Sequence, residues 1–283
     1  MTKAGVPAAV KPSSSSLYVR QVGRGVPVVF VHGTPSSSFE FRHVMDALAG
    51  DHRCLAPDHL GFGQSPKPPD ADYRVVAHQR RFGETLDRLD LEPAIFVLHD
   101  FGTAIALPWM LAHPRRVRGV LLCNTFLWPA QGPLRWLFGF YSTAFGRWLY
   151  RVGNLSAKYL LPSAWGTAKP LDPELHAQYL APFADRDSRY ATAALPGELV
   201  GATLAEMEPQ SSALGQWPVR AVWGMSDPFL GSRELDRWRQ ILPGLVVDTV
   251  ALAGHFVAEE APETVQRAVR ALSARPNVEI QPH

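Results

Sequence analysis

Three titratable residues of the 283-residue chain each come shortly after an apolar run, and their types suit nucleophilic catalysis. Asp100 follows the run 94–98, Asp227 follows 219–223, and His255 follows 246–252. If each run is a strand of one parallel sheet, the three side chains emerge at the same edge, in the chain order nucleophile, acid, histidine. A Gly-His pair after one strand is more often structural, so the catalytic interpretation depends on the joint spacing of all three.

Asp100 occupies the tip of a predicted sharp turn. The segment 96–104 indicates a strand, a turn through Phe101 and Gly102, and a helix. Such a turn holds the tip side chain beside a helix N-terminus, whose free N–H groups favour developing negative charge. A carboxylate at this place attacks a saturated carbon and leaves an ester, whereas attack on an ester or amide would give a reactive anhydride. Considered alone, Asp100 is equally compatible with capping the following helix.

The segments around these residues alternate between strand and helix patterns. We expect strands at 17–22, 26–31, 53–56, 94–98, 117–122, 219–223 and 246–252. We expect helices that begin near 36–38 and at 75–89, 103–111, 233–241 and 262–272. This alternation predicts an α/β protein with a mostly parallel central sheet and helices on both faces.

The strand pattern stops between 129 and 216, where helical segments rich in aromatic residues take its place. We therefore expect a helical cap at 129–216, inserted into a core made of 17–128 and 217–275. The segment 1–16, rich in Ala, Pro and Ser, is expected to be a flexible N-terminal tail, and 276–283 a C-terminal tail.

An aromatic stripe runs through the predicted cap. Phe138, Tyr141, Phe145, Trp148 and Val152 recur at helical spacing, with Arg135, Arg147 and Arg151 off that line. A stripe of this kind is compatible with a membrane surface. Because Gly139 and Gly146 interrupt it, we favour a helix packed over a core or against a second subunit, so a homo-oligomer through cap helices is expected.

Composition narrows the class of partner. A formal net charge of +2 and a charged share of 19% give neither a basic stripe nor an acidic tail, so we expect no nucleic acid and favour a small apolar organic substrate. Cys54 and Cys123 lie in apolar runs and are expected to be buried free thiols. The chain shows neither a signal peptide nor a membrane span, which predicts a cytoplasmic protein. Nothing in the motifs requires a cofactor or a metal.

Four segments carry a family resemblance. They are 32–35 (HGTP), 58–65 (DHLGFGQS), 99–102 (HDFG) and 254–256 (GHF). On these segments the chain resembles the α/β-hydrolase superfamily, and within it the haloalkane dehalogenases and the related epoxide hydrolases. The resemblance implies that Asp100 displaces a halide to form an alkyl-enzyme ester and that His255 activates the water that hydrolyses it. Chloride or bromide would be the second product.

The resemblance also bears on the acid of the triad. Some members take this acid after the strand that precedes the cap, but residues 123–125 here are Cys-Asn-Thr and contain no carboxylate. Asp227 is therefore the expected acid, as in members that place it after the following strand.

Two positions of the expected halide site depart from the family pattern. Haloalkane dehalogenases usually hold the halide between the indole of a Trp after the nucleophile and an Asn amide, whereas this chain has Phe101 and Thr34. Losing both donors should slow carbon–halogen cleavage, because each hydrogen bond to an ion contributes about 1.5 to 3 kcal/mol. The Thr34 hydroxyl or a cap tryptophan would have to substitute; the candidates are Trp128, Trp136, Trp148 and Trp165. The backbone N–H groups of Thr34 and Phe101 remain available to an oxyanion. We expect Phe229 and Phe256 in the substrate pocket.

Other functions stay open at this point. An epoxide hydrolase uses the same triad with two cap tyrosines as acids; the candidates are Tyr141, Tyr150, Tyr159, Tyr179 and Tyr190. A cofactor-independent oxygenase or a non-catalytic small-molecule-binding protein is less favoured, because an intact Asp-His-Asp set has no purpose in pure binding.

Overall fold

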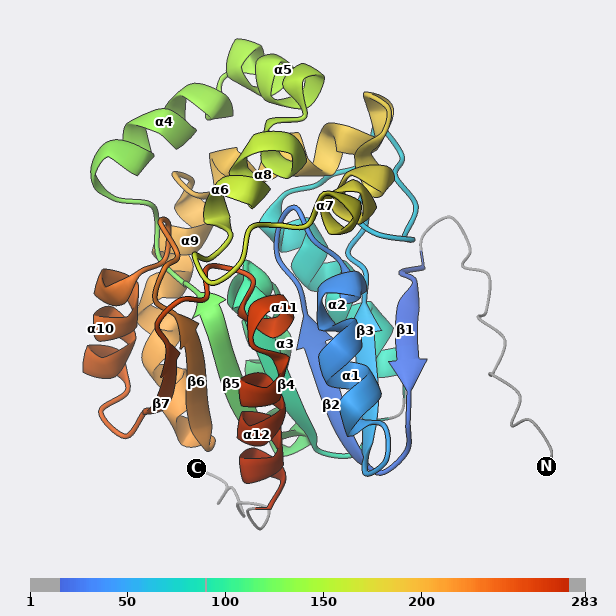
Figure 1. The fold of residues 1–283 in the computed structure, drawn as a ribbon, viewed down its shortest axis with the longest axis vertical. Coiled ribbons are helices and arrows are strands. Elements are labelled where there is room, and N and C mark those ends of the chain that lie inside the picture. Colours follow the sequence, from blue (N-terminus) through green and yellow to red (C-terminus); the bar gives the residue numbers. More distant parts are fainter. Residues whose placement is uncertain (1–15, 90, 275–283) are drawn as a thin grey trace, which may run out of the picture.

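The computed structural model describes residues 16–89 and 91–274. The two predicted tails lie outside these residues, apart from residue 16. A seven-stranded sheet forms the centre of the described chain, with the strand order β1-β3-β2-β4-β5-β6-β7 (Figure 1). The strands are β1 (Val19–Val22), β2 (Val26–Val31), β3 (His52–Pro57), β4 (Ala94–Asp100), β5 (Val117–Thr125), β6 (Val219–Gly224) and β7 (Val246–Val250).

The strand order creates a crevice at one edge of the sheet. Strands β2 to β7 are parallel and β1 is antiparallel to β3. The chain goes from β2 to β3 on one side and then returns to β4 on the other side of β2, so the order reverses between β2 and β4. Open parallel sheets bind ligands outside the C-terminal ends of strands at such a reversal. The loop after β2 carries Thr34 to this place, and the end of β4 carries Asp100 there.

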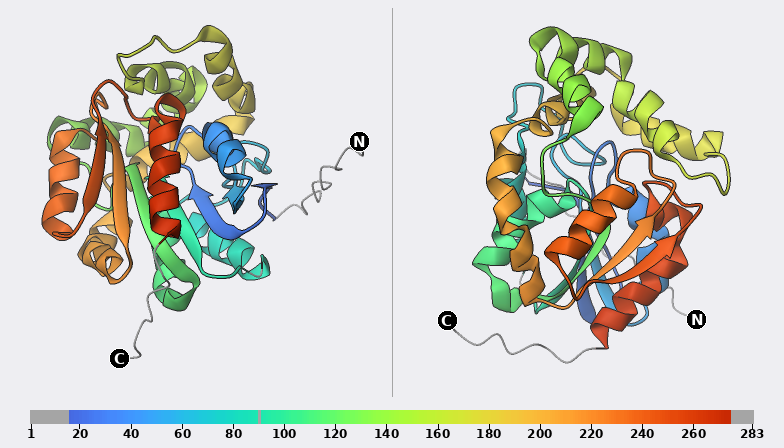
Figure 2. Two further views of the ribbon diagram at one scale, coloured as in Figure 1. Left: turned by 60° about the horizontal axis from the view of Figure 1, so that its bottom comes forward. Right: turned by 90° about the vertical axis from the view of Figure 1, so that its left-hand side faces the viewer.

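Helices cover both faces of the sheet (Figure 2). In β2, Val29 and Val31 face one apolar cluster, while Val28 and Phe30 face the other, as the two-residue period of a strand requires. The first cluster is covered by α2 (Val75–Arg88), α3 (Gly102–Ala112) and α10 (Ser232–Ile241). The second is covered by α1 (Arg42–Leu48), α11 (Val257–Glu260) and α12 (Pro262–Ser273). The predicted α/β class is confirmed, with strand and helix ends that differ by a few residues; the short α11 was not predicted.

Between β5 and β6 the chain is helical and lies above the C-terminal edge of the sheet (Figure 1). Its α-helices are α4 (Gly132–Ser142), α5 (Ala144–Gly153), α6 (Leu161–Ala164), α7 (Pro173–Leu180), α8 (Tyr190–Glu198) and α9 (Ala202–Met207). A π-helix at Ser156–Leu160 follows α5, and 3-10 segments lie at Ala181–Phe183, Asp187–Arg189 and Glu208–Gln216. Two 3-10 turns of the core are Ser38–Phe41 and Pro114–Arg116.

The aromatic stripe of α4 and α5 is not packed as we expected. α4 has no buried residue, and α5 buries only Gly146 and Tyr150. Phe145 and Trp148, two members of the stripe, are exposed. Phe138, Tyr141 and Val152, the other members, are partly buried, and Tyr141 packs against Tyr150. The helical period was correct, and within this chain the stripe is packed only in part; a second subunit is not tested by one chain.

Both cysteines are free and buried, as predicted. Burial raises the pKa of Cys54 to about 12, which leaves this thiol protonated and unreactive at neutral pH. No helix among the described residues is long and apolar enough to cross a bilayer.

Candidate active site

Asp100 lies at a strained turn between β4 and α3. Its φ is 51°, in the left-handed region that non-glycine residues rarely adopt. Two glycines permit this turn to lie close to β2. A Cβ on Gly33 would lie 2.2 Å from Cβ of Asp100, and a Cβ on Gly102 would lie 2.4 Å from the carbonyl oxygen of Val31. A side chain at either position would displace Asp100 or its turn.

Backbone N–H groups surround the Asp100 carboxylate. The amide of Thr34 donates to Oδ2 at 2.8 Å, and the amide of Phe101 also donates to this carboxyl group. Phe101 is the N-cap residue of α3, so the positive end of the helix dipole faces the carboxylate. Burial raises the pKa of Asp100, while positive charge at His255 and His99 and these N–H donors act in the opposite direction. The same two amides are the donors expected for an oxyanion.

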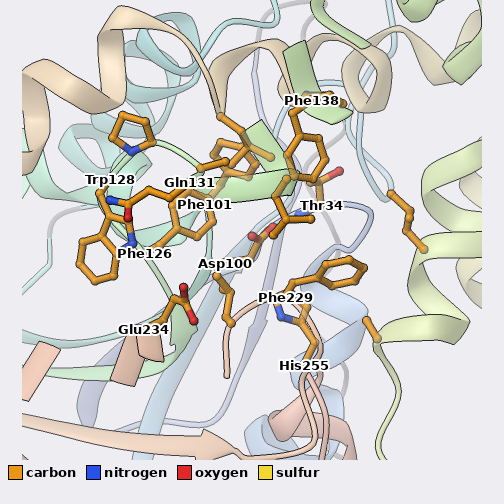
Figure 3. A pocket seen from close by; sticks show the side chains of 18 of the residues that line it. Thr34, Asp100, Phe101, Phe126, Trp128, Gln131, Phe138, Phe229, Glu234 and His255 are labelled. Carbon is orange, nitrogen blue, oxygen red and sulfur yellow. The ribbon is translucent and has the colours of Figure 1, made fainter. Parts of the chain in front are cut away.

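His255 and Asp227 meet at the next strand ends. Nδ1 of His255 lies 2.7 Å from Oδ2 of Asp227, and the backbone N–H of His255 donates to the carbonyl of Ala164 in the cap segment. The other oxygen of Asp227 accepts the amides of Phe229 and Leu230 at 2.8 and 3.1 Å. These bonds fix the carboxylate and leave Nε2 of His255 free to face the cavity that Asp100 lines (Figure 3).

The electrostatics of this pair favour an imidazolium beside a carboxylate. Burial by itself lowers the pKa of His255, but the charge and hydrogen bond of Asp227 and the charge of Asp100 raise it to about 9. Burial by itself raises the pKa of Asp227; the charge and hydrogen bond of His255 and the two loop amides hold it below its usual value. The charge state of His255 therefore depends on the charge of Asp100.

Asn124 is a residue that the sequence did not reveal as part of this site. Its Nδ2 donates to Oδ2 of Asp227 at 2.9 Å and to the carbonyl of Gly224 at 3.0 Å, and its Oδ1 accepts the amide of Gly224 at 2.8 Å. Its φ is 32°, another left-handed residue at a strand end. The end of β5, which has no carboxylate, thus provides the side-chain amide of Asn124, and this amide orients the carboxylate of Asp227 after the neighbouring strand β6.

A second buried pair ties the nucleophile turn to the histidine loop. Nδ1 of His99 lies 3.0 Å from Oε1 of Glu40, and its Nε2 lies 2.9 Å from the carbonyl oxygen of His255. Both side chains are almost fully buried. The residue directly before Asp100 therefore bonds the backbone of His255, and this fixes the spacing between the two loops.

A cavity of about 720 Å³ opens between the sheet edge and the helical segment. Asp100, Phe101, Thr34 and His255 line its floor, and both predicted pocket residues, Phe229 and Phe256, also line it (Figure 3). Its other lining includes Phe126, Trp128, Leu134, Phe138, Tyr150, Ser156, Leu160, Leu161 and Leu199. Most of this surface is apolar, which suits an apolar organic molecule.

Few side chains near the reacting end of the cavity donate hydrogen bonds. Oγ1 of Thr34 is buried and has no partner among the described residues. Of the four candidate tryptophans only Trp128 lines the cavity, while Trp136 and Trp148 are exposed. Tyr150 is the one candidate tyrosine that lines the cavity; it bonds Ser156 of the π-helix, and burial raises the pKa of its phenol. The phenol therefore stays protonated at neutral pH.

Comparison with known proteins identifies the family to which the fold belongs. Residues 26–262 match the α/β-hydrolase fold family. The chain is 31% identical over 252 residues to haloalkane dehalogenase 2 of Mycobacterium tuberculosis, and the match covers 87% of each chain. The chain therefore belongs to the α/β-hydrolase family. Within that family it is a haloalkane dehalogenase-like protein.

Two further relatives widen the comparison. The chain is 29% identical to a cis-3-alkyl-4-alkyloxetan-2-one decarboxylase of Shewanella oneidensis, over 89% of this chain and 83% of the other. A crystal structure of a mutant of the haloalkane dehalogenase DatA from Agrobacterium tumefaciens superposes with a TM-score of 0.81 at 29% identity. That match covers 95% of this chain and 97% of the other. The fold is thus shared with enzymes named for different substrates.

Proposed function

We propose that this chain is a haloalkane dehalogenase-type hydrolase in which Asp100 is the nucleophile, His255 the base and Asp227 the acid. The observation that carries the proposal is the Asp100 carboxylate, held by two backbone amides at the floor of an apolar cavity beside the His255–Asp227 pair. An apolar cavity with a buried carboxylate suits displacement at a saturated carbon.

The first step is displacement. A carboxylate oxygen of Asp100 attacks the carbon that carries the halogen, the carbon–halogen bond breaks, and the halide leaves with the electron pair. The product is an ester of Asp100, so the charge of this side chain disappears. Because that charge raises the pKa of His255, ester formation lowers this pKa and frees the imidazole to act as a base.

The second step is hydrolysis. Nε2 of His255 takes a proton from water, and the hydroxide adds to the ester carbon of Asp100. The resulting oxyanion is stabilised by the amides of Thr34 and Phe101. Collapse expels the alcohol oxygen, which takes the proton from His255, and leaves Asp100 as a carboxylic acid; loss of its proton restores the carboxylate. In sum, one haloalkane and one water give one alcohol, one halide and one proton.

The experiment traps the ester. His255→Ala keeps the nucleophile but lacks the base, so incubation with a haloalkane should raise the intact mass by one alkyl group on Asp100 and stop there. Asp100→Asn is the matched control and should gain no mass. The panel should include bromoalkanes, chloroalkanes, epoxides and a cis-3-alkyl-4-alkyloxetan-2-one. If no substrate gives an adduct at Asp100, covalent catalysis is refuted and the binding-protein or oxygenase alternative takes its place.

Epoxide hydrolysis is the second candidate, and Tyr150 supports it. A phenol that lines the cavity, is oriented by Ser156 and stays protonated is the acid type that an opening epoxide needs. Tyr141 lies against Tyr150, with ring centroids 5.1 Å apart, but does not line the cavity. Diol formation without halide release in the same panel would favour this function.

A further inference from the structure

The outer surface of α4 and α5 exposes an unusual group of large apolar side chains. Six of the ten exposed large apolar residues in the described chain lie on this helix pair. We call them the cap aromatic patch: Trp136, Leu137, Phe140, Phe145, Trp148 and Leu149. Trp136 is 84% exposed, Phe145 62% and Trp148 51%. Soluble proteins scatter exposed apolar residues singly, so a concentration like this indicates a contact surface.

Three members of the patch are in contact across the two helices. The ring of Phe140 on α4 lies 6.4 Å from that of Phe145 on α5, and Phe145 stacks on Trp148 with centroids 5.8 Å apart. Both helices stand at the outer end of the molecule, farthest from the base of the sheet (Figure 1). They therefore meet any flat surface that approaches from that end.

The two helices that carry the patch contain three arginines and no carboxylate. Residues 126–171, which include both helices, contain five Lys or Arg and no Asp or Glu. The exposed side chains of Arg135 and Arg147 flank the patch and have no ion pair with any described residue. Arg151 is paired with Asp187 at 3.8 Å and stacks on Tyr190. The patch is apolar at its centre and cationic at its border.

An apolar centre with arginines at its border favours one kind of binding partner. A second copy joined by a twofold axis would place the same arginines against one another, with no carboxylate in the patch to pair with them. Anionic lipid headgroups pair with arginines, and Trp and Phe side chains enter the boundary between headgroups and acyl chains. We propose that the cap aromatic patch docks this protein on an anionic lipid surface.

The position of α4 links docking to the cavity. Leu134 and Phe138, from the same helix, line the cavity, while Trp136 and Phe140 belong to the patch. α4 therefore forms a thin wall between the lipid surface and the cavity. An apolar molecule dissolved in the lipid has a short path to Asp100. The docking itself does not depend on the reaction at Asp100.

Vesicle sedimentation tests the proposal with the full chain. Wild type should sediment with vesicles of phosphatidylcholine plus phosphatidylglycerol, should sediment much less with phosphatidylcholine alone, and should be released by salt. Phe145→Ser with Trp148→Ser, and separately Arg135→Glu with Arg147→Glu, should each weaken binding at least tenfold. Val246→Ser, at the start of β7, and Arg24→Glu, in the turn between β1 and β2, are exposed positions outside α4 and α5; they are the matched controls and should bind like wild type.

Two outcomes would overturn the proposal. In the first, wild type does not bind anionic vesicles and sediments in the ultracentrifuge as a dimer, and Phe145→Ser with Trp148→Ser converts this dimer to monomers. The patch is then an interface between copies. The other is wild type that stays a monomer and fails to bind either vesicle. Circular dichroism on each variant separates lost docking from lost folding.

Discussion

At the scale of residues, the charge of Asp100, the proposed nucleophile, affects the pKa of His255, the proposed base. The Asp100 carboxylate helps to raise the pKa of His255 to about 9, so the free protein holds an ion pair at neutral pH. Esterification would remove the negative charge of Asp100 and leave Asp227 as the ion-pair partner of His255. In the proposed reaction the pKa of His255 therefore falls when the ester forms, which favours its action as a base in the second step.

Tyr150 provides a test of what stabilises the leaving group. Phe101 and Thr34 stand where the family resemblance leads us to expect an indole and an amide donor, and the phenol of Tyr150 lines the same cavity and stays protonated, so we expect it to donate to the halide. Losing a hydrogen bond to an ion costs about 1.5 to 3 kcal/mol, so Tyr150→Phe should slow halide release about 10- to 150-fold. Tyr159→Phe, an exposed cap tyrosine, is the control. Halide release measured within twofold of wild type would show that Tyr150 is no donor to the halide.

Residue types revealed only part of this site. Asp100, Asp227 and His255 were found because each follows a strand, and the structure brings all three to one sheet edge. Asn124 was not found, because an amide at a strand end has no distinctive pattern and its role depends on a contact 103 residues away. Likewise, nothing local distinguishes Tyr150 from the other cap tyrosines. Only the packing of the cap selects it.

At the scale of elements, core helices and strands were predictable because burial on one or two faces dictates their periods. The same argument fails for α4 and α5. A helical stripe has the same spacing whether it packs on a core or faces outward, so the sequence predicted the helix and not its surroundings. The short α11 was missed because four residues are too few to show a period.

The approach of the β2 loop to the β4 turn predicts the effect of one methyl group. Gly33→Ala would place a carbon 2.2 Å from Cβ of Asp100, so the nucleophile must move. We expect alkylation of Asp100 to slow more than 100-fold while the protein stays folded, because the clash is with a side chain at the surface of a cavity. Gly50→Ala, where no atom lies within 4 Å, is the control. Equal rates of mass increase in the two variants, measured on the His255→Ala background, would contradict this.

At the scale of the whole molecule, the topology of the sheet brings together a cluster of buried histidines in addition to the candidate active site. His32, His59 and His78 pack against one another beneath the β2 loop, with His32 and His59 ring centroids 4.2 Å apart and those of His59 and His78 5.6 Å apart. Burial lowers the pKa of His32 to about 3 and also holds the pKa values of His59 and His78 well below 6.5. Topology creates this cluster, since its members come from three separated segments.

The two kinds of histidine predict where stability is greatest. Below pH 6.5 the histidines of the unfolded chain bind protons, whereas the three buried rings of the folded protein do not. The free energy of unfolding therefore decreases as the pH is lowered, by at most about 1.4 kcal/mol per pH unit for each ring. His255 acts in the opposite sense. Between pH 6.5 and 9 the folded protein holds a proton that the unfolded chain releases, so stability falls as pH rises through this window.

Urea unfolding across this pH range should therefore give a maximum near pH 6.5, with the steeper decline on the acid side. His78→Leu removes one buried ring and should reduce the acid slope by about one third, since three rings contribute to it. His255→Ala should flatten the alkaline side and leave the acid slope unchanged. An acid slope that His78→Leu does not alter would mean that this ring titrates normally in the folded protein, and the buried cluster would then not account for acid sensitivity.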